Sequence, residues 1–292
     1  MIEADLTAAQ IDALAARGDI ARIEANREIA LQRPALGPWP DASSDGASAH
    51  APQAIEWGVN KVRAPLVWAE GFNGQGVVVA GQDTGIRWTH NAIKAKYRGW
   101  NGITADHNYN WHDAIHETGS SCGANSLVPC DDHSHGSHTV GTMVGDDGGS
   151  NQVGVAPGAK WIGCRNMNAG VGTPARYNEC AEWFLAPTDR NGQNPDPDRA
   201  PDVINNSWGC PADEGCTAGN EVRQAIENLV AGGIVFVASA GNDGSSCQTI
   251  FSQPGTLDAA FVVGSMTSSD TMSGFSSRGP VPGLGEVKPD VI

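Results

Sequence analysis

Basic residues and long apolar runs are scarce in this chain, and both shortages narrow the range of functions. Lys and Arg total 18 against 33 Asp and Glu, which gives a formal net charge of −15 over 292 residues. A surface this acidic disfavours binding to nucleic acid and to anionic membranes. No apolar run approaches the roughly 18 residues that a membrane-spanning helix needs. The sequence therefore predicts neither a nucleic-acid partner nor a membrane partner.

An export signal is also missing from the start of the chain. An acidic, helix-prone segment follows Met1, in place of the basic and then apolar pattern of a signal peptide. Taken alone, that absence would favour a cytoplasmic protein. The alternative is that the natural N-terminus lies further upstream, and this is our expectation.

The cysteines lack the Cys-x-x-Cys spacing of zinc and redox sites, which argues against both. The seven positions are Cys122, Cys130, Cys164, Cys180, Cys210, Cys216 and Cys247. Cys122 and Cys130 bracket one short polar loop, and Cys210 and Cys216 bracket another. Seven free, mostly buried thiols are the alternative, but polar loops are poor places to bury a thiol. We therefore predict two local disulfides and an oxidising compartment.

Composition divides the chain into three parts. Residues 4–31 read as a helix capped by Thr7 and then, over residues 19–26, as a short alternating strand. Residues 33–52 are rich in Pro, Ser, Ala, Gly and Asp without periodicity, which is typical of an exposed linker. The main domain begins near Trp57. The predicted boundaries are 1–32, 33–56 and 57–292.

The main domain alternates short apolar runs with amphipathic stretches. The apolar runs that read as buried strands are residues 77–80, 160–164, 203–206, 234–239 and 261–264. The amphipathic stretches that read as helices are residues 138–144, 175–185 and 221–231. This alternation predicts an α/β fold, a doubly wound parallel sheet with helices on both faces and functional sites at the carboxyl ends of the strands. Residues 105–132 are polar and irregular, and we interpret them as an inserted surface loop.

Two residues in this framework have catalytic potential. Asp83 follows the first apolar run at an Asp-Thr-Gly turn, and His135 stands at the mouth of a helix in a His-Gly-Ser-His segment. A carboxylate that accepts a hydrogen bond from an imidazole fixes its tautomer and stabilises its protonated form, as in an Asp-His-Ser triad. The alternatives are an Asp that only caps its turn and a catalytic role for His138. If His135 is the base, we expect His138 to be packed and hydrogen-bonded to backbone.

Six segments in order carry a family resemblance. They are Asp-Thr-Gly at 83–85, His-Gly-Ser-His at 135–138, Val-Gly-Val-Ala-Pro at 153–157, Asn-Asn-Ser-Trp-Gly at 205–209, Ala-Ser-Ala-Gly-Asn at 238–242 and Phe-Ser-Ser-Arg-Gly-Pro at 275–280. On these motifs the chain resembles the subtilisin-like serine peptidases, nearest to the bacillopeptidase F-like group, over residues 57–292. Residues 4–31 look like the end of the inhibitory propeptide that accompanies such enzymes.

The resemblance implies peptide-bond hydrolysis and a role for each site residue. His135 becomes the base, oriented by Asp83, and the side-chain amide of Asn242 donates to the oxyanion of the tetrahedral intermediate. Read without the resemblance, Asn242 suits a turn in the left-handed conformation. The implied substrate-binding residues are Gly170, Val171 and Gly172, which would pair with an extended peptide, and Ser207, Trp208 and Gly209, which would line the other side of the cleft and the specificity pocket. Without the resemblance these are ordinary loop residues, and Trp208 stands where a smaller apolar residue is common in the family.

Cofactors and partners follow from the same resemblance. The implied chemistry requires no cofactor. The pair formed by His135 and His138 has no convincing third metal ligand, although Asp132 and His133 keep a metal site open. Residues 146–151 resemble a calcium loop of related enzymes but are Gly-rich and read better as a solvated turn, so structural calcium stays an option. The expected partners are protein or peptide substrates and the chain's own propeptide, and the expected form is a secreted monomer.

The third triad member is absent. No Ser in a Gly-Thr-Ser-Met type turn stands in the 292 residues. A Gly-x-Ser-x-Gly match at residues 119–123 lacks the preceding strand and following helix of a nucleophile elbow, and Ser137, Ser239 and Ser276 are no better placed. We expect the Ser to lie beyond this stretch and the 292 residues alone to be inactive. The hypotheses are a serine endopeptidase seen in part and a non-catalytic relic that at most binds peptides. An acid peptidase of the sedolisin type is disfavoured, since it would carry Glu in place of His135.

Overall fold

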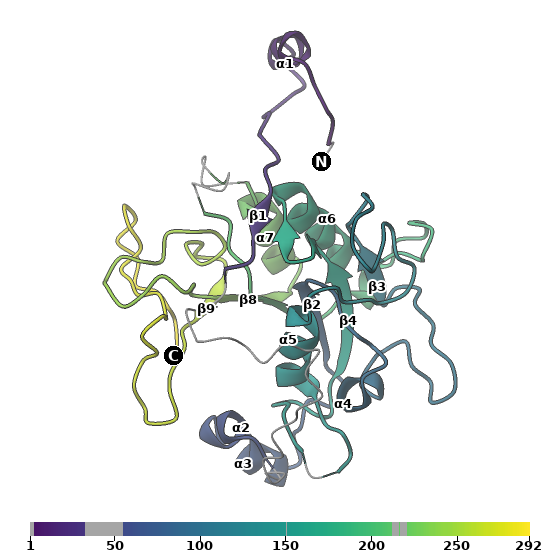
Figure 1. Ribbon diagram of the computed structural model, residues 1–292, viewed down its shortest axis with the longest axis vertical. Coiled ribbons are helices and arrows are strands. Elements are labelled where there is room, and N and C mark those ends of the chain that lie inside the picture. The colour runs from purple at the N-terminus through teal and green to yellow at the C-terminus, as the bar shows by residue number, and fades with distance from the viewer. Residues whose placement is uncertain (1–2, 33–54, 150, 212–215, 217–220) are drawn as a thin grey trace.

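A parallel sheet forms the centre of the molecule. The computed structural model describes residues 3–32, 55–149, 151–211, 216 and 221–292. Its main sheet has six strands in the order β3-β4-β2-β7-β8-β9, and every neighbouring pair is parallel (Figure 1). The strands are β2 (Val78–Asp83), β3 (Trp111–Asp113), β4 (Lys160–Arg165), β7 (Val203–Asn206), β8 (Val235–Ser239) and β9 (Phe261–Val263). The predicted α/β fold is confirmed.

Helices pack on both faces of this sheet. The helices in the described part of the chain are α1 (Ala8–Ala15), α2 (Trp57–Lys61), α3 (Ala64–Ala69), α4 (Asn91–Lys94), α5 (His135–Val144), α6 (Pro174–Leu185), α7 (Arg223–Ala231) and the short 3₁₀ helix η1 (Pro197–Arg199), of which α5 and α6 pack on opposite faces of the sheet. Val79 and Ala80 are successive residues of β2, so their side chains point to opposite faces. Val79 belongs to the apolar cluster that holds Val140 of α5, whereas Ala80 belongs to the one that holds Phe184 of α6. None of the helices in the described part of the chain is long and apolar enough to cross a membrane.

The predicted elements are in place but differ at their ends. β2 runs on to Asp83 rather than ending at residue 80, because its pairing with β4 continues to that residue. α5 begins at His135 rather than at residue 138, and α7 begins at residue 223 rather than 221. The cap predicted for the first helix is present, since the side chains of Thr7 and Gln10 form a capping box.

Two predictions about irregular segments were wrong. Residues 19–26 carry no strand, and the nearby strand is β1 (Ile29–Ala30), which pairs antiparallel with β6 (Val171–Gly172). An alternating pattern is not sufficient, because a strand also needs a partner edge. Residues 105–132 are not a surface loop throughout, since β3 forms the edge of the main sheet beside β4. The predicted linker at residues 33–52 lies outside the described part of the chain.

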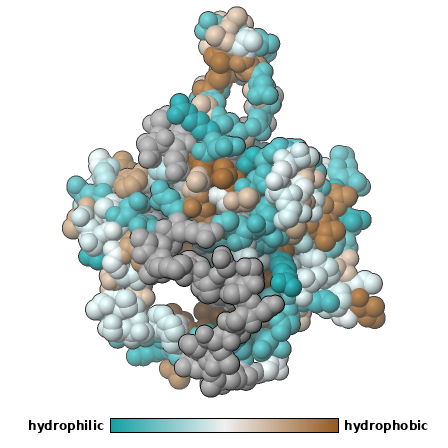
Figure 2. Space-filling view, viewed as in Figure 1, coloured by the Kyte–Doolittle hydropathy of each residue, from teal (hydrophilic) through white to brown (hydrophobic). Residues whose placement is uncertain are grey.

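The N-terminal segment stands apart from the domain body. α1 has no buried residue and projects away from the sheet (Figures 1 and 2). The segment first becomes buried at Ile29, whose side chain is only 1% exposed. β6 pairs on its other side with β5 (Met167–Asn168), so β1 completes a small antiparallel sheet in the order β1-β6-β5. The N-terminal segment is therefore held to the domain through β-strand pairing.

Both predicted disulfides are present, and a third joins the sheet to a helix. Cys122–Cys130 and Cys210–Cys216 close the two short loops, while Cys164–Cys180 links β4 to α6. Cys247 is the remaining cysteine, and its thiol is free and exposed. The pairing accounts for all seven cysteines as three bonds and one thiol.

We expect peptide mapping of the unreduced protein to recover these three disulfides and to find one alkylated residue, Cys247. The two short loops hold their cysteines close together, so their bonds should form locally. Mapping after full reduction provides the control. Long-range pairs from either short loop, or alkylation at a position other than Cys247, would contradict the assignment.

Candidate active site

The sheet and α5 bring the predicted acid and base together. Asp83 is the last residue of β2 and is 1% exposed, and His135 is the first residue of α5. The His135 Nδ1 atom lies 2.7 Å from the Asp83 Oδ1 atom. The backbone N–H of Thr84 also donates to Oδ1, at 2.7 Å. A buried carboxylate in this position holds the imidazole in one orientation.

Asp131 holds the two sides of this pair in place. Its Oδ1 atom accepts hydrogen bonds from the Thr84 hydroxyl at 3.0 Å and from the backbone N–H of Ser134 at 2.8 Å. Its Oδ2 atom accepts from the backbone N–H of Ser137 at 2.9 Å and from the hydroxyl of the same residue at 2.6 Å. Ser134, the N-cap residue, has φ of 73° and makes no side-chain cap, so Asp131 does the capping of α5. Sequence reasoning missed Asp131, although an Asp four residues before a candidate His is a visible signal.

Two glycines allow the Asp83 turn and α5 to approach this closely. A Cβ atom on Gly136 would lie 2.1 Å from the Gly85 carbonyl oxygen. A Cβ atom on Gly85, whose φ is +108°, would lie 1.9 Å from the Cys130 carbonyl oxygen. Neither distance is tolerable for a real side chain, so both positions require glycine.

Asn242 lies after β8 and contacts the N-terminal segment. Its side-chain Nδ2 atom donates to the backbone carbonyl oxygen of Gln32 at 3.1 Å. Gly241 before it has φ of +99°, in the region that favours glycine. The turn is held by the Ser277 hydroxyl, which accepts from the backbone N–H of Asp243 at 3.0 Å. The amide of Asn242 is thus directed at a peptide carbonyl.

The predicted substrate-binding residues on β6 contact the same segment. Gly172 and Val171 pair with β1, and the backbone N–H of Leu31 donates to the Gly170 carbonyl at 2.7 Å. A Cβ atom on Gly170 would lie 3.0 Å from the His133 ring, and that ring lies 6.4 Å from the His135 ring between centroids. The structure therefore brings β6, residues 29–31 and the Asp83–His135 pair together near the carboxyl end of β2.

The second predicted set of substrate-binding residues, Ser207, Trp208 and Gly209, directly follows β7, and its central residue is buried. Trp208 is 4% exposed and stacks on Tyr177, with ring centroids 3.9 Å apart. Both residues share an apolar cluster with Ile29 of the N-terminal segment. The hydroxyl of Ser207 accepts from the Asn205 side chain at 3.1 Å, and a Cβ atom on Gly209 would lie 3.0 Å from the hydroxyl oxygen of Ser252.

One expectation about histidine fails. His138 is exposed on α5 instead of being packed. Only a narrow face of α5 packs against the sheet. Val140 and Val144 lie on that face, and His138 does not. Within the described residues, no group of three His, Cys, Asp or Glu side chains could hold a metal ion.

In the described part of the loop at residues 146–151, two carboxylates accept hydrogen bonds from backbone N–H groups. Asp146 accepts the backbone N–H of Gly148, and Asp147 accepts that of Gly149, both at 2.8 Å. Each carboxylate thus binds its own turn, and the structure does not describe residue 150.

Comparisons with known proteins agree with this geometry. The Subtilase family (peptidase S8) model matches residues 74–292. Bacillopeptidase F of Bacillus subtilis (strain 168) is 39% identical over 248 residues, which is 82% of this chain and 16% of that protein. Subtilisin DY of Bacillus licheniformis is 31% identical over 229 residues, covering 78% of this chain and 70% of that protein. The Major intracellular serine protease of Bacillus subtilis (strain 168) is 28% identical over 222 residues, covering 75% and 60%.

The chain thus spans a small part of the first of these relatives and between half and about two thirds of most of the others. The family model covers three quarters of the chain and includes the Asp83 turn, α5 and the loop that carries Asn242. On the match and on the geometry, the chain belongs to the subtilase family of serine peptidases.

Proposed function

We propose that this protein is a serine endopeptidase in which Asp83 and His135 are two members of an Asp-His-Ser triad. The third member is a Ser that the 292 residues do not contain. Support comes from the 2.7 Å hydrogen bond between His135 Nδ1 and Asp83 Oδ1. With Nδ1 engaged in this way, Nε2 is the nitrogen that exchanges a proton with the nucleophile.

The proposed reaction follows from this geometry. The Ser hydroxyl oxygen attacks the carbonyl carbon of the substrate peptide bond while His135 takes the hydroxyl proton. Asp83 stabilises the imidazolium that forms. The oxygen of the attacked carbonyl gains negative charge, and Asn242 Nδ2 donates a hydrogen bond to it. His135 then gives its proton to the leaving amine, and water releases the acyl group by the same steps.

The observation that carries the proposal is the position of residues 29–32. They lie extended along β6, with the Leu31 N–H bonded to Gly170 and the Gln32 carbonyl bonded to Asn242. A peptide substrate lying in the same way would present the carbonyl of its cleaved bond to Asn242. We therefore propose that residues 1–32 act as a propeptide and that the bond between Gln32 and Arg33 is the processing site.

The same arrangement assigns the substrate contacts. Gly170, Val171 and Gly172 would bind the substrate backbone as an added strand. Ser207, Trp208 and Gly209 would form the opposite side of the cleft. Ile29 is buried in the cluster that contains Trp208 and Tyr177, so a large apolar substrate side chain is favoured at the fourth position before the cleaved bond.

Localisation, cofactor and partners are proposed on related grounds. Three disulfides favour an oxidising, extracellular location. The reaction requires no metal or cofactor, and we propose that the protein acts as a monomer on peptide substrates. The second candidate is a non-catalytic relic that binds peptides, since the pairing of residues 29 and 30 with β6 requires no nucleophile. A relic would bind residues 29–32 but leave the bond after Gln32 intact.

We expect Asp83→Asn and His135→Ala to lower kcat by roughly 10⁴-fold or more in a form of the protein that hydrolyses peptides, with little change in KM. Both residues act mainly in the transition state, so substrate binding should persist. Steady-state kinetics with a fluorogenic peptide would measure both constants. His138→Ala is the matched control on the same helix, and near-normal kcat in either test variant would remove that residue from the triad.

Asn242→Ala is expected to lower kcat by about 10²–10³-fold while KM and the melting temperature change little. This magnitude is the one typical of a side-chain amide donor in the subtilisin family, to which the chain belongs. The physical reason is that the amide meets full negative charge only in the tetrahedral state. Kinetics and thermal melts on one preparation separate this role from that of a turn residue, which would lower the melting temperature and leave kcat intact.

Processing should release residues 1–32. In a catalytically competent form, intact-mass measurement and N-terminal sequencing are expected to place the new N-terminus at Arg33. The His135→Ala variant should remain unprocessed, because cleavage uses the same catalytic residues. Cleavage at another bond would refute the assigned site, and persistent lack of cleavage in the unmutated form would favour the relic.

A further inference from the structure

The turn that leads into β6 has an unusual backbone. It consists of Ala169 and Gly170, between Asn168 at the end of β5 and Val171 at the start of β6. Ala169 has φ of 48°, a conformation that a residue with a side chain rarely adopts. Such a conformation persists only where the surroundings hold it. The backbone N–H of Ala169 donates to the Asp132 Oδ1 atom at 3.0 Å, which identifies one of the groups that hold it.

Asp132 divides its two oxygens between this turn and a buried guanidinium. Its Oδ2 atom lies 3.2 Å from an Arg165 terminal nitrogen, NH1. The Arg165 side chain is completely buried and the Asp132 side chain is 2% exposed, so water does not screen the pair. A change in the position of Arg165 would therefore be transmitted to the turn through one carboxylate.

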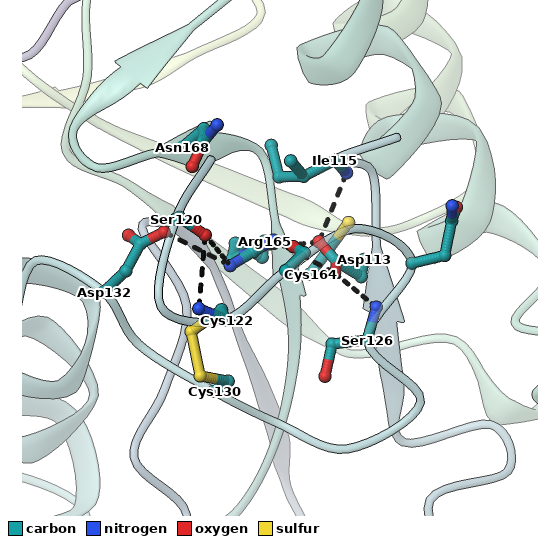
Figure 3. A network of polar contacts seen from close by, with 12 residues as sticks. Asp113, Ile115, Ser120, Cys122, Ser126, Cys130, Asp132, Cys164, Arg165 and Asn168 are labelled. Carbon is teal, nitrogen blue, oxygen red and sulfur yellow. Dashed lines mark hydrogen bonds and ion pairs between the residues drawn. A yellow bond between two sulfur atoms is a disulfide. The ribbon is translucent and has the colours of Figure 1, made fainter. Parts of the chain in front are cut away.

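Arg165 is itself held from several sides (Figure 3). Its Nε and NH2 atoms lie 2.8 and 3.2 Å from the two carboxylate oxygens of Asp113. It also donates to the Gly123 carbonyl at 2.5 Å and to the Ser120 hydroxyl at 3.4 Å. A bidentate guanidinium–carboxylate pair is strongly directional, so it determines where Arg165 points. Burial raises the pKa of the Asp113 carboxyl, and the charge of Arg165 opposes that rise.

All these partners of Arg165 come from one stretch of chain. Residues 113–132 run from the end of β3 to the start of the His135 loop, and Cys122–Cys130 closes the loop within them. Glu117 in the same stretch accepts a hydrogen bond from the Asn168 side chain at 3.1 Å. Residues 113–132, which we call the insert, thus contact two successive residues, Asn168 at the end of β5 and Ala169 in the turn.

We propose that Asp132 and Arg165 are positioning residues for substrate binding: they hold the turn at Ala169 so that β6 is in register to pair with a peptide. The proposal rests on the proposed function, because it takes residues 29–32 as the stand-in for a substrate. Gly170, which accepts the Leu31 N–H, is the residue next to Ala169. A shift of the turn would thus move the Gly170 carbonyl oxygen, which accepts the hydrogen bond from the Leu31 N–H.

The remaining contacts of β6 act on other atoms. His133 packs against Gly170, and an Arg176 terminal nitrogen donates to the Val171 carbonyl at 3.1 Å. These contacts should keep β6 near its place when Asp132 is changed. The expected effect is therefore local and partial, rather than loss of the fold.

Amide hydrogen exchange on the full chain tests the proposal without requiring catalysis. In Asp132→Ala the Leu31 amide is expected to exchange about 10- to 100-fold faster than in the parent, which corresponds to loss of one charged hydrogen-bond partner from the turn. Amides in the middle of β2 should keep their protection. Each protein is compared at the same interval below its own melting temperature.

Lys288→Met is the matched control. Lys288 is 6% exposed and pairs with Asp290 at 2.8 Å, beside β9 and away from the turn. This variant also removes an ion pair, one whose ammonium is buried and whose carboxylate is partly exposed, so it reports the effect of lost stability away from the turn. Should Asp132→Ala not fold, Asp132→Asn takes its place: it keeps the side-chain size, abolishes the ion pair with Arg165 and is again expected to speed exchange at Leu31 beyond the control.

Unchanged protection of Leu31 in the Asp132 variants would overturn the proposal, and so would a loss no larger than in Lys288→Met. The outcome is distinguishable from failure of the proposed function. If the bond after Gln32 is never cleaved but Leu31 exchanges selectively faster, the positioning role stands and the peptidase assignment fails. If cleavage occurs and Leu31 is unaffected, the reverse holds.

Discussion

The parallel register between β2 and β4 is the constraint on which both halves of the site depend. It pairs Asp83 with Arg165 at the carboxyl ends of the two strands. One of these residues orients His135, and the other anchors the insert that holds the β5–β6 turn. A slip of one residue would turn each side chain to the opposite face of the sheet. A single register therefore sets the positions of the Asp83–His135 pair and of Arg165 together.

Two consecutive acidic residues, Asp131 and Asp132, bind different parts of the site near the carboxyl ends of β2 and β4. Asp131 binds the Thr84 turn and the first turn of α5, which relates the base to its orienting carboxylate. Asp132 binds the Ala169 turn and Arg165, which relates the insert to the substrate strand. Because the two are neighbours in the chain, a single piece of backbone connects the Asp83–His135 pair to the turn before β6.

Sequence reasoning recovered what depends on local pattern. The short apolar runs at the start of β2 and within β4 were recognisable because parallel strands are covered on both faces, and Asp83 stands shortly after the first of these runs. It failed where the partner is distant. β3 is three residues long and is a strand only because β4 supplies its hydrogen bonds, and residues 19–26 look more like a strand than β1 does but have no partner edge. The contacts of Asp131 with the Thr84 turn and of Asp132 with the Ala169 turn were missed for the same reason, since both turns lie tens of residues away in the chain.

Buried ion pairs add little to the free energy of unfolding, but their hydrogen bonds fix the orientation of the groups that they join. The Arg165 network has this second effect. Two buried carboxylates surround one guanidinium, so removing Arg165 would leave both of them buried without their cation. Burial already raises the pKa of Asp113, and the charge of Arg165 opposes that rise. The network is therefore stable when complete and unfavourable when incomplete. Apolar packing in its place would let the Ala169 turn slide, whereas hydrogen bonds of fixed geometry hold a strained residue, and the strand beyond it, in one position.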